Sequence, residues 1–145
     1  MNRARTRLAH SRGMLFAALV FLLGAVPGQT QKTHTDFKVA AAIWKRVQMK
    51  EAALDRTIRS KKLKVVHEAA FAVRDQVKLL PAKSKALSAD DQTKLTKGVK
   101  TVANLATQLD AAGDGGRQAE AEALDKKVHT VLDAIAGLYP AGALK

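Results

Sequence analysis

Apolar residues recur at intervals of three and four positions in four separate stretches of this sequence. In the clearest stretch they are Leu63, Val66, Ala70, Val73, Val77 and Leu80. That interval matches the 3.6-residue turn of an α-helix, so each stretch forms one apolar stripe along a helix face. A helix with such a stripe buries it against a neighbouring helix. The sequence therefore predicts an all-α protein.

Turn and capping signals set the boundaries of these helices. Pro81 disfavours helix in the residue before it, which predicts a helix end at Leu80. Ser88, followed three positions later by Asp91, resembles a capping box, and Gly113 is suited to the left-handed conformation that ends many helices. The expected helices cover about 36–60, 62–80, 89–112 and 117–139.

Matched helix lengths and short connections predict an up-down-up-down antiparallel four-helix bundle. The other three helices each have their own apolar stripe. The expected core residues are Ala40, Ile43, Trp44, Val47, Leu54 and Ile58; Leu95, Val99, Val102, Leu105 or Ala106, and Leu109; and Ala121, Leu124, Val128, Val131, Ile135 and Leu138.

Residues 1–28 have the layout of a secretory signal peptide. Four arginines and no acid precede an uncharged run of 13 residues, Met14 to Val26, and small residues follow. A membrane-spanning helix needs about 20 apolar residues, so a retained anchor is the alternative. Cleavage is expected after Gly28, with cleavage after Ala25 as the alternative. Cleavage after Gly28 leaves 117 residues, one domain, in a periplasmic or secreted protein. We expect a flexible start at 29–35, a first helix capped by Thr35 or Asp36, and a tail at 141–145.

The chain without the predicted signal peptide is basic and has no cysteine. It has 21 basic and 13 acidic residues, a net charge of +8, which favours an anionic envelope component, an acidic protein or the membrane surface as partner. Basic residues are not interleaved with stacking aromatics, so nucleic acid is not expected. The lysines expected at one end of the bundle are the candidate contact surface for an anionic partner, and an ordinary solvated surface is the alternative. These lysines are Lys78, Lys83, Lys85, Lys94 and Lys97.

Catalytic and metal-binding patterns are sparse. No nucleophile elbow, phosphate-binding loop or dinucleotide fingerprint occurs, so no enzyme is expected. The candidate metal ligands are His67, His129 and His34. Glu-x-x-His is missing, and the nearest approach is Asp125 with His129, one helical turn apart. His67 lies at the edge of its stripe, where a structural role is the simpler interpretation.

The stretch "LDAAGDGGRQAEAEALDKKVHTVLDAIAGLYP" and the proline-bearing loop before the third helix resemble the periplasmic soluble cytochrome b family. The resemblance covers nearly all of the chain after the signal peptide and implies a four-helix bundle in the periplasm. That family holds haem between a methionine and a histidine. Here Ala136 falls at the histidine position, Val47 falls near the methionine position, with Met49 two residues away, and His129 lies two turns too early.

"VHEAAFAVRD" and "LYP" are also similar to small exported helical proteins, some linked to metal stress. We therefore expect a small exported, non-enzymatic bundle without a cofactor, which has a binding or accessory role in the cell envelope through its basic surface. The alternatives are a periplasmic metal-binding or metal-stress protein and a divergent cytochrome-b-like haem protein.

Overall fold

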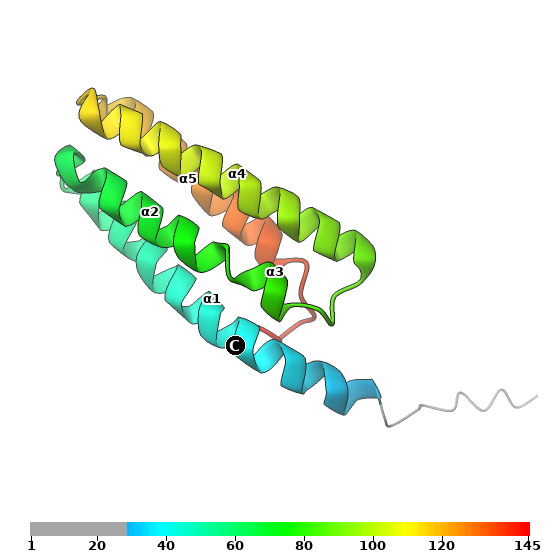
Figure 1. The fold of residues 1–145 in the computed structure, drawn as a ribbon. Helices are drawn as coiled ribbons and strands as arrows, with labels where there is room; N and C mark the ends of the chain where they lie inside the picture. The colour runs from blue at the N-terminus through cyan, green and yellow to red at the C-terminus, as the bar shows by residue number, and fades with distance from the viewer. Residues whose placement is uncertain (1–28) are drawn as a thin grey trace, which may run out of the picture.

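The protein is an antiparallel four-helix bundle (Figure 1). The computed structural model describes the backbone of residues 29–145 and the side chains of residues 37–145. The predicted signal peptide and the side chain of His34 lie outside these ranges. No strand occurs within residues 29–145. The elements are α1 (Gln29–Arg59), the 3-10 turn η1 (Leu63–Val65), α2 (Val66–Val77), α3 (Leu80–Lys83), α4 (Ala89–Asp114) and α5 (Gln118–Ala136).

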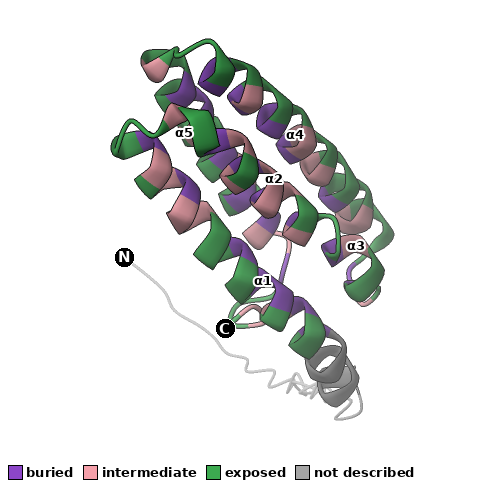
Figure 2. Cartoon of the chain, turned by 60° about the vertical axis from the view of Figure 1, so that its left-hand side comes forward, coloured by how far each residue is buried: buried purple, intermediate pink, exposed green. Residues whose placement is uncertain are grey.

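The core is formed by the inward faces of the four long helices (Figure 2). α1 packs on α2, α2 on α4, and α4 on α5, while α5 makes a smaller contact with α1. All predicted stripe residues of α1 are buried, and so are those of the second stripe except Leu63, which is half-buried. The predicted stripe of α4 is buried except for Val99, and both Leu105 and Ala106 face the core. Hydrophobic spacing alone therefore identified most of the core.

The inward face of α5 differs from the prediction near its end. Leu132 is buried in place of Val131, and Leu138 is only half-buried, whereas Tyr139 is buried. From Val128, a step of four residues leads to Leu132 as directly as a step of three residues leads to Val131. α5 also ends at Ala136 instead of Tyr139, so the residues after it are not bound to helical spacing.

The predicted helix over 62–80 is wrong as a single element. The chain forms η1, then α2, then a turn at residues 78–79, and then the short helix α3. Pro81 lies in the first turn of α3. Proline is tolerated there because the first N–H groups of a helix have no intrahelical partner. Pro81 therefore helps to start a helix instead of ending one.

The folded bundle extends beyond the predicted boundaries, residues 36 and 140, at both ends. α1 begins at Gln29, so residues 29–35 are helical, and the predicted cap at Thr35 or Asp36 is wrong because both residues lie inside the helix. This stretch contains no glycine or proline, and a helix can continue through it. Residues 141–145 are not a free tail, because Ala143 and Leu144 are half-buried against the core.

The two ends of α4 show one confirmed and one corrected prediction. Ser88 caps α4: its Oγ accepts a hydrogen bond from the Asp91 N–H at 3.1 Å. Gly113 does not adopt the left-handed conformation, which Gly116 has instead with φ of 64°. Gly113 is buried against η1, where an added Cβ would lie 2.7 Å from the carbonyl oxygen of Leu63. Its small size matters more than its flexibility.

Among the described residues, no helix has the length and apolar character needed to span a membrane.

Candidate functional site

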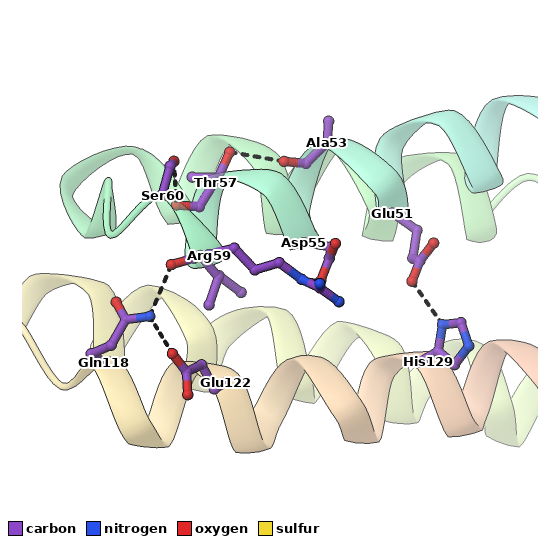
Figure 3. Close-up of polar contacts among 10 residues, drawn as sticks. Glu51, Ala53, Asp55, Thr57, Arg59, Ser60, Gln118, Glu122 and His129 are labelled. Carbon is purple, nitrogen blue, oxygen red and sulfur yellow. Dashed lines mark hydrogen bonds and ion pairs between the residues drawn. The ribbon is translucent and has the colours of Figure 1, made fainter.

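A polar groove runs between α1 and α5 (Figure 3). Glu51 and Asp55 lie one turn apart on α1, and Asp125 and His129 lie one turn apart on α5, so each pair shares a helix face. The groove has a volume of about 520 Å³. Its lining residues are Glu51, Ala52, Asp55, Arg59, Asp125, Lys126, His129 and Thr130.

His129 joins the two helices across this groove. Its Nδ1 lies 2.8 Å from Glu51 Oε1, and its Nε2 lies 3.8 Å from Asp133 Oδ2. The hydrogen bond to Glu51 and the negative charge of that carboxylate raise the pKa of His129 above its ordinary value of 6.5. The imidazole is 63% exposed, so we expect this pair to contribute little stability.

Asp125 lies on the wall of the groove with one poorly satisfied oxygen. Its Oδ1 is buried and has no hydrogen-bond partner among the described residues. Burial and, after it, the negative charges of Asp55 and Glu51 together raise the pKa of this carboxyl to about 6. His129 and Arg59 act in the opposite direction. Asp125 therefore changes its protonation state close to neutral pH.

Gln118 links α5 to the C-terminal part of α1, beside the groove. Its Nε2 donates to the main-chain carbonyl of Ile58 at 2.9 Å and to Glu122 Oε1 at 2.6 Å. Beside it, Arg59 Nε donates to Asp55 Oδ1 at 2.7 Å. Polar contacts thus supplement the limited apolar contact between α1 and α5.

His67 and His129, the two candidate metal ligands whose side chains are described, do not belong to a common cluster of metal-ligating side chains. Within the described part of the chain, no group of three or more histidine, cysteine, aspartate or glutamate side chains is placed to hold a metal ion. His67 lies on α2, half-buried, with its ring edge-to-face against Phe71 at a centroid distance of 6.4 Å. The guanidinium of Arg74 stacks on the ring of Phe71, with its Cζ 4.1 Å from the ring centroid. His67 therefore belongs to an aromatic and cationic packing cluster, away from the surroundings of His129.

All five predicted surface lysines are exposed at the end of the bundle that contains α3. Lys94 is neutralised locally, because its Nζ lies 2.6 Å from Asp90 Oδ2 and 3.6 Å from Asp91 Oδ1. The other four make no ion pair with any residue between 37 and 145, namely Lys78, Lys83, Lys85 and Lys97. We call these four the α3-end lysines.

Two further features lie at the α3 end. Leu79 is 46% exposed next to Lys78. On α4, Lys97 and Lys100 border a shallow depression of about 400 Å³ whose remaining lining consists of Gln92, Thr93 and Thr96. The α3 end therefore carries ammonium groups, hydroxyls and one exposed apolar side chain.

The sequence pointed to some of these residues and missed others. The sequence predicted that Asp125 and His129 lie one helical turn apart. It did not predict that Glu51 and Asp55 of α1 line the same groove. The four-residue spacing of Glu51 and Asp55 does show that they share a helix face. The sequence around them contains no signal that this face lies beside α5. The ion pairs of Lys94 had a signal in the spacing from Asp90, because residues four apart on a helix are neighbours.

The fold and these surfaces define a small helical bundle with a polar inter-helix groove and a lysine-rich end. No protein-family model, curated protein or solved structure matches this chain.

Proposed function

We propose that this protein is a small exported binding or accessory protein of the cell envelope, which acts without catalysis by holding an anionic partner on the α3-end lysines. The observation that carries this proposal is their freedom from intramolecular ion pairs with the described residues. Lys78 follows α2, Lys83 ends α3, Lys85 lies in the loop and Lys97 lies on α4. Four ammonium groups from successive elements thus remain available to a partner.

Such a surface acts mainly by attracting and orienting its partner. Exposed ammonium groups gain little from any one contact, but together they raise the rate of encounter with an anion. The interaction is screened at salt concentrations where the Debye length falls below about 8 Å. Strong dependence on ionic strength is therefore the signature that the proposal requires.

Binding to polyaspartate provides a test, because this probe carries charge without a large apolar surface. The test variant replaces all four α3-end lysines by glutamine. A matched control replaces four exposed basic residues elsewhere: Arg56, Lys62, Lys64 and Lys127. We expect the test variant to bind about tenfold more weakly than the control at 50 mM salt, and the difference to shrink at 500 mM. Equal loss in both variants would show that net charge, and not this surface, governs binding.

Export is supported by the basic head and apolar run of residues 1–28. Intact-mass measurement of the protein from the envelope fraction of its host tests it. We expect a mass that lacks the first 25 to 28 residues. A full-length mass in the cytoplasmic fraction would contradict export. A retained metal or haem in the same measurement would contradict a function without cofactor.

A further inference from the structure

The outward face of α1 between residues 38 and 50 carries only positive charge. Lys38, Lys45, Arg46 and Lys50 are all exposed, and no acidic residue occurs from 37 to 50. None of the four makes an ion pair with another described residue. These charges lie on α1, whereas the α3-end lysines lie on or beside α2, α3 and α4.

Apolar side chains project between these charges. Val39 is 50% exposed and Met49 is 63% exposed, which makes them two of the four large apolar side chains that the described chain leaves in solvent. Ala42 is exposed as well. Helical spacing puts Ala42 and Met49 between Lys38 and Lys45 on one side and Arg46 on the other. Val39 lies beside Arg46. We call these residues the α1 face: Lys38, Val39, Ala42, Lys45, Arg46, Met49 and Lys50.

A groove of about 690 Å³ borders this face. One wall comes from α1 and the other from the C-terminal turn, in which Ala143 and Leu144 pack against the core. Lys145 stands on the far wall, opposite Lys38 and Lys45. The aliphatic part of the lining comes from both sides: Ala41, Ala42, Ala143 and Leu144. The basic border and apolar centre of the α1 face thus continue onto the C-terminal turn.

We propose that the α1 face is a docking surface for a bilayer rich in anionic lipid. A bilayer surface offers negative headgroups above an apolar layer, and the α1 face offers ammonium and guanidinium groups around apolar side chains. Lysine and arginine can lay their aliphatic stems along the apolar layer and keep their charges at the headgroups. An acidic protein would match the charges but would leave Met49 and Val39 without a reason for exposure.

The shape of the α1 face also suits a bilayer. Its residues lie along one side of a single helix over about three turns, so they can meet a flat surface together. A helix that lies on a membrane in this way uses both apolar burial and attraction to anionic headgroups. Removing either contribution should weaken docking separately. This inference goes beyond the proposed function, because it uses other residues and requires apolar contact.

Cosedimentation with vesicles tests the proposal, with protein recovered from the envelope fraction of its host. The vesicles are phosphatidylcholine alone and a 3:1 mixture of phosphatidylcholine and phosphatidylglycerol. We expect binding to the mixed vesicles that is at least about tenfold stronger than to the neutral ones and that falls with salt. Equal binding to both would overturn the proposal.

Two variants separate the contributions. Val39→Gln with Met49→Gln keeps every charge and should weaken binding to the mixed vesicles about tenfold, because it removes the apolar contact. Lys38→Gln with Lys45→Gln should weaken it by a similar factor. The matched control, Val65→Gln, replaces another exposed apolar side chain and should bind as the wild type does. All changes are on exposed side chains, so circular dichroism should confirm an unchanged fold.

The same variants distinguish this proposal from the proposed function. Val39→Gln with Met49→Gln should bind polyaspartate like the wild type, because no charge is lost. If that variant still binds the mixed vesicles at wild-type strength, the α1 face is not a lipid surface, whatever polyaspartate shows. If loss of the α3-end lysines abolishes binding to polyaspartate but leaves vesicle binding intact, the two surfaces act independently, as inferred.

Discussion

Replacing Asp125 by asparagine tests the electrostatics of the α1–α5 groove. The pKa of this carboxyl rises from an ordinary 3.8 to about 6 in the folded chain, first because it is buried. A raised carboxyl pKa means that folding favours the protonated form. The associated stability is present below about pH 4 and is lost as pH rises through about 6. Asparagine has nearly the same size and does not ionise, so it should remove this loss.

The magnitude follows from the pKa change. Each tenfold change in an acid constant corresponds to about 1.4 kcal/mol, so full burial would set an upper bound of about 3 kcal/mol. Asp125 is only half-buried, and water screens part of the effect. We therefore expect the Asp125→Asn variant to be about 1–2 kcal/mol more stable than the wild type at pH 8. At pH 4 the two proteins should be nearly equal.

Urea denaturation followed by circular dichroism at several pH values from 4 to 8 measures this difference. The control is Asp114→Asn at the exposed end of α4, which should change stability by less than about 0.5 kcal/mol at every pH. His129 shifts the wild-type curve in the same direction, because its raised pKa makes its contribution disappear as pH rises through that pKa. Both variants keep His129, so most of its contribution cancels in the comparison, because Asp125 is the smallest of the causes that raise the His129 pKa.

An Asp125→Asn variant that is less stable than the wild type at pH 8 would refute this reasoning. A stability gap that stays constant from pH 4 to pH 8 would refute it as well. Either result would mean that the ionised carboxylate gains an interaction in the folded state that outweighs its burial and the repulsion from Asp55 and Glu51. A cation held in the groove would be the first explanation to examine, by repeating the titration with a chelator.

Three further predictions can be checked by the same unfolding measurements. Gly113→Ala should lower the free energy of unfolding by about 1–3 kcal/mol, because the new Cβ would lie 2.7 Å from the Leu63 carbonyl oxygen in η1. Its control, Gly137→Ala, should be neutral or slightly stabilising, because the nearest atom there is 3.5 Å away. Tyr139→Phe should lose about 1–2 kcal/mol, because it breaks a 2.6 Å hydrogen bond to the buried Ser84 hydroxyl, and adding Ser84→Ala should recover part of that loss. His67→Leu should be neutral or stabilising, since the ring packs on an aromatic side chain and has no hydrogen bond among the described residues; a loss above about 1 kcal/mol would reveal a broken buried hydrogen bond.

The sequence by itself determined the features that depend on neighbours along one helix. Alternating steps of three and four residues identified nearly all of the buried face of α1 and the faces of α2 and α4, because a helix repeats every 3.6 residues. The cap at Ser88 was readable for the same reason, since its partner Asp91 is three residues away. The exposure of the lysines at the α3 end also followed from their positions outside the stripes.

Only the tertiary structure decided what depends on segments far apart in the chain. Pro81 is compatible with a position after one helix and with the first turn of another, and in the folded chain it lies in the first turn of α3. Gly113 reads as a flexible helix end until η1 is brought against it. Glu51 and His129 are 78 positions apart, and only the packing of α5 beside α1 brings them within hydrogen-bond distance. Local periodicity determines which face a helix buries, but the helix that meets it is chosen by the packing of the whole bundle.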